Sequence, residues 1–538
     1  MSTIITKEYM RDQPLEQHFD VLVVGAGHNG LVNSTFLSRA GLRVLQVEDK
    51  DIIGGCTKTE HPFRKVPGMG ASTGAYLLGL MPPELVKKLD LDITPMRRDP
   101  HYFMPTTDGR YLLFGSDKVE MKKQFLQFFS QADWDANEKM NAELDMLRED
   151  IAPTWLQEPL SVEETAERFV RPALRQAFIN LCRGTAKDYV SKFGFQSDLL
   201  RGMYVTTDGC SGLSSVSQGT GMNFLVHNMC RLPSSDGTWM IIKGGMGAVS
   251  NAIADVSRKA GTKIDTGRGV HKLVIREGRV FGAELKDGTK VFAPIVVINA
   301  DPFRMTDLIG KHHLPQNYID RIDRYRRDGM TMKVNLCLKS LPKFTCLPEN
   351  KGQYGTTTHI LPPGPNVMEQ IEKAYAQAAA GILPEFPTIE WYTHTPIDPS
   401  IQDKDGHHNA ALFVQWVPYT IKGSTWEAEE ERYVKHLLSL VDIYAPGTSE
   451  LVVDVFALPP PKLEKHFGIT RGHIHHVDNG IPFDERLPYN TPIRGLYSCS
   501  AGCHPAGSVI GSSGHNSAMR ILKDLKDNVI NLERPAKL

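Results

Sequence analysis

The chain has 538 residues and a mass of 60.0 kDa, more than one hydrophobic core usually organises, so we expect two structural units. Hydrophobic residues make up 41% of the chain and charged residues 23%, as in ordinary globular proteins, which excludes a disordered chain. The formal net charge of -1 provides no electrostatic attraction for nucleic acid, so we expect no nucleic-acid partner.

The apolar content also limits where the protein acts. No apolar stretch reaches the roughly 18 residues that span a bilayer, and residues 1–20 are charged throughout, without the apolar core of a signal peptide. Eight cysteines are scattered without a repeated spacing or a C-x-x-C pair, which indicates reduced and mostly buried thiols. We therefore expect a cytoplasmic protein with at most weak peripheral contact with a membrane.

The predicted elements alternate between strand-rich and helical blocks along the chain. A capping box at Ser161 and Glu164 opens one helix of the helical block, and Lys286 to Gly288 form the turn of a later hairpin. In chain order, the predicted segments are a polar arm (1–18), a first cofactor-binding segment (19–110), a helical or substrate region (111–237), a second cofactor-binding segment (238–312), a mixed substrate domain (313–468) and a third cofactor-binding segment (469–538).

The strongest motif is "DVLVVGAGHNGLVNSTFLSRAGLRVLQVE", in which Gly25, Gly27 and Gly30 form G-x-G-x-x-G after a strand and at the start of a helix. Gly25 permits the tight turn, Gly27 lets backbone amides approach a pyrophosphate, and Gly30 lets the helix pack closely on the strand. Glu48, at the end of the next strand, would accept hydrogen bonds from ribose hydroxyls. Because strand, spacing, helix and acid coincide, we predict a dinucleotide site and not an unrelated glycine turn.

The segment after Glu48 indicates which dinucleotide the site binds. Gly54 and Gly55 follow it, an extension typical of flavoproteins. With "VVGAGHNGLV", "KGGMGAVSNAIADVSRKAGTKIDTGRGV", "VVINADP", "GITRGHIHHVD" and "TPIRGLYSCSAGCHPAGSVIG", the chain resembles the phytoene desaturase superfamily of FAD-dependent oxidoreductases, in the branch of the desaturase-like carotene ketolases and the proteins named as pyridine nucleotide-disulfide oxidoreductases. The resemblance implies an α/β fold, with a doubly wound Rossmann-type FAD domain assembled from discontinuous segments and an inserted sheet-plus-helices substrate domain.

The resemblance also assigns residues to the cofactor. It implies that non-covalent FAD contacts Gly25, Gly27, His28, Asn29, Gly30, Glu48, Gly54, Gly55, Thr57, Val270, Ala300, Asp301, Gly502, Ser508 and Val509. Many relatives have Arg after the glycine pair, where this chain has Cys56 and Thr57, so the pyrophosphate contact at that point departs from the family pattern.

Three side chains are candidates for catalysis. Lys333 interrupts an apolar strand, an awkward place for an ammonium group unless it faces a polar cavity, the alternative being an edge-strand lysine that reaches solvent. His504 lies in the last glycine-rich loop, where it would act as an acid or base or bond the flavin ring. His476 belongs to "RGHIHHVD", which has no Cys or carboxylate partner at metal spacing, so we expect no metal site and place His476 near the boundary between flavin and substrate.

Two further patterns have competing interpretations. Gly245-x-Gly247-x-x-Ser250 also follows a strand and opens a helix, as a second nucleotide site for NAD(P)H would. The fingerprint is incomplete, so we favour the simpler interpretation that this segment returns the chain to the flavin domain. Cys499 and Cys503 are separated by three residues, which lacks the geometry of a redox dithiol.

These observations predict an FAD-dependent oxidoreductase that dehydrogenates or desaturates a hydrophobic, isoprenoid-like or alicyclic small molecule by hydride transfer to flavin N5. The electron acceptor would be O2 or a quinone. An alternative is an amine or alcohol oxidase that uses O2, for which Lys333 is the hint. A second alternative is a flavin-stabilised interaction protein without turnover, and a homo-oligomer stays open.

Overall fold

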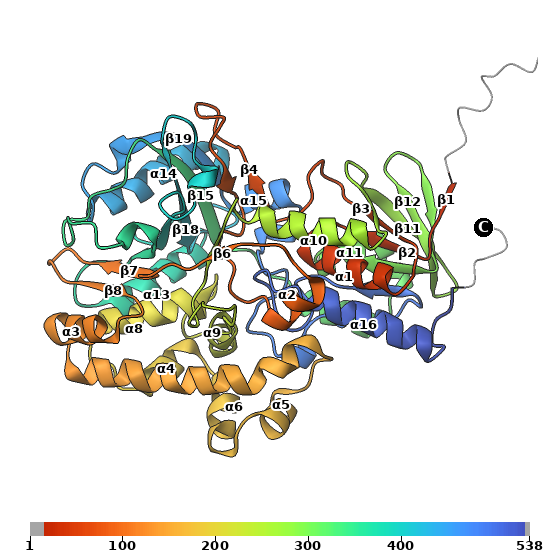
Figure 1. The fold of residues 1–538 in the computed structure, drawn as a ribbon, viewed down its shortest axis with the longest axis horizontal. Coiled ribbons are helices and arrows are strands. Elements are labelled where there is room, and N and C mark those ends of the chain that lie inside the picture. Colours follow the sequence, from red (N-terminus) through yellow and green to blue (C-terminus); the bar gives the residue numbers. More distant parts are fainter. Residues whose placement is uncertain (1–15, 533–538) are drawn as a thin grey trace, which may run out of the picture.

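The computed structural model describes residues 16–532. The predicted arm, residues 1–18, lies outside these residues except for Glu16–His18, which form strand β1 and not an irregular arm. Within the described residues, no helix is both long and apolar enough to cross a membrane. Figure 1 shows three regions: a sheet domain with helices on the right, a second sheet domain on the left, and a helical layer along the bottom.

The cofactor-side domain is built on a five-stranded parallel sheet whose strands come from three distant parts of the chain. This confirms a doubly wound domain assembled from discontinuous segments. The strand order is β10 (Lys263–Asp265), β3 (Val44–Val47), β2 (Val21–Val24), β14 (Ile295–Ile298) and β20 (Leu496–Ser498).

The apolar run of β2 is continuous because both faces of this sheet are covered. Val21 and Val23 pack toward helices α1 and α16, whereas Leu22 and Val24 pack toward a second, four-stranded sheet. Helix α1 packs between α10 and α16. The elements concerned are α1 (His28–Arg39), α10 (Gly247–Lys259), α16 (Ser512–Lys526), and the sheet β1–β13–β12–β11 with β13 (Lys290–Phe292), β12 (Arg279–Leu285) and β11 (Val270–Arg276).

The substrate-side domain is a seven-stranded mixed sheet. Helix α14 (Trp426–Asp442) packs on it through a second apolar core. Its first strand lies at residues 102–105, so the predicted boundary of the first cofactor-binding segment at residue 110 is wrong. The strand order is β19 (Val452–Leu458), β15 (Thr331–Leu338), β18 (His408–Gln415), β17 (Thr388–Thr393), β16 (Thr357–Ile360), β7 (Tyr102–Pro105) and β8 (Tyr111–Phe114).

The helical layer closes the molecule along its lower side (Figure 1). The predicted capping box is confirmed, because Ser161 Oγ accepts from the Glu164 amide and the Glu164 carboxylate accepts from the Ser161 amide. A π-helical turn, Val205–Cys210, joins the last two helices. The helices of the layer are α3 (Lys118–Phe128), α4 (Gln131–Ile151), α5 (Val162–Phe169), α6 (Arg175–Arg183), α7 (Ala186–Ser191), α8 (Asp198–Tyr204) and α9 (Thr220–His227).

The remaining elements connect these three regions. Of two short antiparallel pairs, one lies within residues 59–72 and the other joins residues 95–96 to residues 241–242. The elements are α2 (Pro83–Leu89), α11 (Pro302–Ile309), α12 (Gln316–Arg324), α13 (Val367–Ala379), α15 (Pro460–Phe467), and the pairs β4 (Thr59–Glu60) with β5 (Ala71–Ser72) and β6 (Pro95–Met96) with β9 (Ile241–Ile242).

Candidate active site

One large cavity, of about 1260 Å³, is lined by residues of both domains and of the helical layer. Pockets for drug-sized ligands usually measure about 300–1,000 Å³, so this cavity has room for more than one small molecule. It begins at the carboxyl ends of β2 and β3, where Val24 and Val47 line it. That is the edge at which open parallel sheets bind ligands.

The glycine loop forms one end of the cavity. Gly25 has φ +96, a conformation that a side chain rarely adopts, and Gly27 is the N-cap of α1 without any side-chain hydrogen bond to the first amides of the helix. Gly54 pairs with Gly27 and donates its amide to the Ala26 carbonyl at 2.8 Å, which places the second glycine turn against the first. The free amides of α1 therefore provide a site for an anion.

Glu48 lies beside this loop as predicted. One carboxylate oxygen accepts from the Ala26 amide at 2.8 Å and the other from the Lys50 amide at 3.0 Å. Each oxygen keeps a further lone pair, so the carboxylate is held in place and can still accept hydrogen bonds from ribose hydroxyls.

Most of the residues predicted for the cofactor line the cavity, and two do not. Gly502 lies outside it. Gly30 acts through packing, because a Cβ there would stand 2.3 Å from the Gly25 carbonyl oxygen. The residues that line it are Gly25, Gly27, His28, Asn29, Glu48, Gly54, Gly55, Thr57, Val270, Ala300, Asp301, Ser508 and Val509.

Asp301 lines the cavity, but its carboxylate already has protein partners. It caps α11 by accepting from the amides of Phe303 and Arg304, and it also accepts from the amide and hydroxyl of Thr470. Its side chain therefore fixes the loop that borders the cavity.

The second glycine motif is not a nucleotide site. Thr59 Oγ1 accepts from the Gly247 amide and Ser72 Oγ from the Met246 amide, so protein hydroxyls occupy the start of α10. A Cβ on Gly247 would stand 2.5 Å from the Thr59 amide nitrogen. No space is left for a pyrophosphate, which agrees with the return of the chain to the flavin domain.

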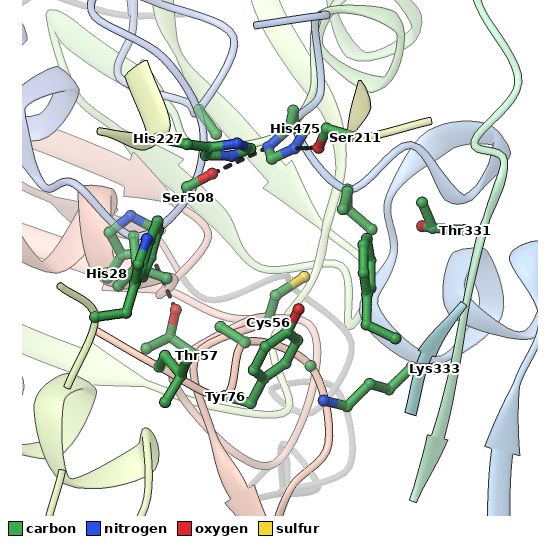
Figure 2. Close-up of a pocket in the computed structure, with 18 of the residues that line it drawn as sticks. His28, Cys56, Thr57, Tyr76, Ser211, His227, Thr331, Lys333, His475 and Ser508 are labelled. Atoms are coloured by element: carbon green, nitrogen blue, oxygen red, sulfur yellow. Dashed lines mark hydrogen bonds between the residues drawn. The ribbon is translucent and has the colours of Figure 1, made fainter. Parts of the chain in front are cut away.

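Two neutral imidazoles border the glycine loop. Burial lowers the pKa of both His28 and His476 to about 4. His28 Nδ1 lies 3.4 Å from Thr57 Oγ1 (Figure 2), and His476 Nδ1 is buried with no partner among the described residues. Thr57 thus offers the cavity a hydroxyl group and no positive charge.

Lys333 faces the cavity from β15, an internal strand next to the edge of the seven-stranded sheet. Strand β15 pairs with neighbours on both sides, so the edge-strand alternative is wrong. The ammonium nitrogen lies 3.5 Å from the centre of the Tyr76 ring and has no hydrogen-bond acceptor within residues 16–532 (Figure 2). Burial lowers the pKa of Lys333 well below its ordinary value, so the side chain is a candidate neutral amine.

Strand β17 contributes groups that the sequence did not single out. Glu390 accepts a hydrogen bond from the Tyr392 hydroxyl, and both side chains line the cavity. Burial raises the pKa of Glu390 to about 8 and that of Asp208, in the π-helical turn, to about 7. Glu390 interrupts the apolar run "TIEWYT" as Lys333 interrupts its own strand. A charged residue in an apolar strand is a signal that could have identified Glu390 from the sequence.

A histidine pair borders the opposite side of the cavity. Figure 2 shows His227 and His475 close together, with Ser211 and Ser508 beside them. His475 Nε2 lies 2.5 Å from Ser211 Oγ. His227 Nδ1 lies 2.8 Å from the Asp208 carbonyl oxygen, so it donates and leaves Nε2 as the acceptor. No periodic signal in the sequence marks His227, which becomes visible only when α9 meets the loop of His475.

The structure does not support His504 as a catalytic group. Its imidazole lies outside the cavity, Nε2 donates to the Thr154 carbonyl at 2.9 Å, and the ring packs edge-on against Phe483. It attaches the last glycine loop to the helical layer, so its role is structural.

The far end of the cavity extends into the helical layer, where apolar side chains line it beside polar and charged ones such as Lys118, Glu138 and Arg148. Each of the six buried apolar side chains there is at most 8% exposed. They are Met121, Trp134, Met140, Leu144, Met203 and Phe224.

FAD fits this arrangement on three counts. The uncapped start of α1 suits the pyrophosphate, Glu48 suits the ribose, and buried polar atoms lack partners among the described residues: Asn29 Oδ1, Lys333 Nζ and His476 Nδ1. Buried polar atoms normally have partners, so these three indicate that a polar ligand completes the site.

Comparisons with known proteins identify relatives along almost the whole chain. The chain is 30% identical to pyridine nucleotide-disulfide oxidoreductase domain-containing protein 2 of Mus musculus, over 95% of each chain. It is 21% identical to a limonene dehydrogenase subunit of Castellaniella defragrans, over 95% of each chain, and 24% identical to the lycopene-forming phytoene desaturase of Pseudescherichia vulneris, over 94% and 99%.

A solved structure shares the fold, and a family model gives the family. Putrescine oxidase bound to putrescine has a TM-score of 0.57 at 17% identity, over 95% of this chain and 100% of that one, which shows a shared fold. The model of flavin containing amine oxidoreductases matches residues 30–357. The protein is an FAD-dependent oxidoreductase, and it belongs to the flavin containing amine oxidoreductase family.

Proposed function

We propose that the protein dehydrogenates a predominantly apolar small molecule, such as an isoprenoid-like or alicyclic compound. The observation that carries this proposal is the apolar part of the cavity in the helical layer, lined by Met121, Met140 and Phe224. The limonene dehydrogenase subunit and phytoene desaturase, both named for apolar hydrocarbon substrates, support it as relatives.

The chemistry divides between cofactor and chain. Bound FAD supplies a two-electron acceptor for the hydride that leaves a substrate C–H bond. Lys333 would accept the proton lost from the neighbouring carbon. Its pKa, which burial lowers, and its Nζ without an acceptor within the described residues support this role. The electron pair of that second C–H bond becomes the new double bond. The final electron acceptor would be O2 or a quinone.

Anaerobic titration of the FAD-loaded protein tests the proposal. Monoterpenes and carotenoid fragments should bleach the flavin absorbance, whereas short polar amines and alcohols should not. Bleaching by amines alone would contradict it.

A second candidate function is amine oxidation with O2. Glu390 and Asp208 favour it, because two buried carboxyl groups line the same cavity as Lys333 and could receive an ammonium group. Amine-dependent formation of hydrogen peroxide, lost in Glu390→Gln with FAD still bound, would support this candidate over the first.

A further inference from the structure

Arg98 is a buried cation whose positive charge has no partner among the described residues. It follows β6, is 3% exposed and lines the cavity. Nε donates to the Trp239 carbonyl at 3.1 Å and Nη1 to Thr357 Oγ1 at 2.8 Å, both neutral acceptors. Nη2 donates to no group, and the guanidinium forms no ion pair with any carboxylate of residues 16–532. Arginine is almost never fully buried unless it is paired.

Two other arginines show how this fold satisfies a guanidinium with its own groups. Arg486, 1% exposed, donates to four backbone carbonyls, which leaves little of its donor capacity unused. Arg97, next to Arg98 in the chain, also lines the cavity, but its charge is paired, since Nη1 lies 2.5 Å from the Asp236 carboxylate. Arg98 has neither arrangement, so its unused edge is available to a ligand in the cavity.

The charged groups around Arg98 do not neutralise it. Glu390 is the carboxyl group whose charge acts on Arg98. Burial raises the pKa of Glu390 to about 8, and its carboxylate accepts a hydrogen bond from the Tyr392 hydroxyl. Burial lowers the pKa of Lys333 well below its ordinary value and that of His101 to about 3, so both bases favour their neutral forms. Arg98 therefore keeps its positive charge in this part of the cavity without an ion-pair partner among the described residues.

We propose that Arg98 binds the carboxylate of the substrate, so that the substrate class is an apolar carboxylic acid with its hydrocarbon body in the helical layer. This inference rests on the proposed function and narrows it. A planar guanidinium edge matches a carboxylate. The apolar wall begins nearby, because Thr357, which accepts from Arg98, pairs in the sheet with Tyr102, and the Tyr102 ring lies edge-on to Phe114 in the cavity wall.

Ligand binding to the FAD-loaded protein tests the assignment without turnover. Decanoate, decan-1-ol and decylamine share one chain and differ in the head group, and calorimetry with the flavin absorbance gives their affinities. Decanoate should bind at least tenfold more tightly than decan-1-ol, and decylamine most weakly. Arg98→Gln should reduce the affinity for decanoate to that for decan-1-ol, and Arg98→Lys should keep part of the preference.

Arg97→Gln is the matched control, since it removes a neighbouring guanidinium that already has an acidic partner, and decanoate should bind to it as to the unchanged protein. Three outcomes would overturn the inference: tighter binding of decylamine than of decanoate, undiminished decanoate binding in Arg98→Gln, or loss of FAD from Arg98→Gln but not from Arg97→Gln. If neither Arg98 variant folds, the ranking of the three probes on the unchanged protein decides. Arg98-dependent decanoate binding without flavin bleaching by any apolar compound would refute the proposed function alone.

Discussion

Replacing Gly27 by Val should remove FAD and leave the fold intact. The backbone of Gly27 has φ -69 and ψ 164, which Val adopts readily, and an added Cβ would meet only Asn299 Nδ2, at 3.1 Å. The free energy of unfolding of the apoprotein should therefore change by about 1 kcal/mol or less. Gly30→Ala differs, because its Cβ would clash with the Gly25 carbonyl oxygen at 2.3 Å and destabilise the fold.

The size of the cofactor effect follows from the start of α1. The branched side chain would occupy the space in front of its uncapped amides, where we expect the pyrophosphate to bind. A hydrogen bond to a charged group contributes about 1.5–3 kcal/mol. Losing two such bonds weakens FAD binding by about 3–6 kcal/mol, or about 10²- to 10⁴-fold in Kd.

The assay is titration of the apoprotein with FAD, followed by quenching of flavin fluorescence, together with thermal unfolding of the same samples. Gly68→Val is the control, because Gly68 is exposed, outside the cavity and only within 3.7 Å of the Asp403 Cβ. Unchanged FAD affinity in Gly27→Val would refute the placement of the pyrophosphate, and an equal loss in Gly68→Val would show that the effect is not local.

Four further predictions concern the cavity and the surface. Lys333→Met should keep FAD and slow flavin reduction by at least 100-fold, which stopped-flow absorbance measures. It should also raise the free energy of unfolding by about 1–3 kcal/mol, which calorimetry measures, because it removes a buried polar atom without a partner among the described residues. Burial raises the folded-state pKa of Glu390 from 4.5 to about 8, so its contribution to stability is complete below pH 4.5 and is lost as the pH rises to 8, at up to about 1.4 kcal/mol per pH unit. Chemical denaturation should show a flatter profile for Glu390→Gln. Replacing Cys499 and Cys503 by Ala should leave turnover within about threefold, because burial raises both thiol pKa values and disfavours a thiolate; loss of turnover with FAD bound would revive a dithiol mechanism. Less than half of the protein should sediment with neutral liposomes at physiological salt, since Leu126 is the main exposed apolar side chain of "QFLQFF".

The cofactor end of the cavity was predictable because its determinants are local. Gly25, Gly27 and Glu48 lie within one βαβ unit, so the spacing along the chain fixes their positions relative to one another. The same reasoning failed for His504, which is near the flavin loop in sequence but turns away to bond with Thr154 in the helical layer. Proximity along the chain does not determine which way a loop side chain points.

The substrate end depends on contacts between distant segments. Arg98, Glu390 and His227 come from a loop, a strand and a helix that are more than a hundred residues apart, and each looks ordinary in its own segment. The strand at residues 102–105 already belongs to the substrate sheet, so the domain boundary lies earlier than predicted. Arg98 therefore lies at the start of the substrate sheet. The periodicity of apolar residues within one segment carries no information on which distant segments come into contact.

Backbone strain identifies the same cavity independently of its side chains. Ser211, His476, Ser508 and Val509 have φ values of 46, 64, 92 and 58, and all four line the cavity. A left-handed conformation is a genuine outlier for a β-branched residue such as Val509 and costs about 1–3 kcal/mol. Strain of this kind persists where the surroundings over-determine it and where function needs the resulting geometry. At Ser508 and Val509 it turns the last glycine loop toward the cavity, so this loop, more than the excluded His504, is the C-terminal segment's contribution to the cofactor.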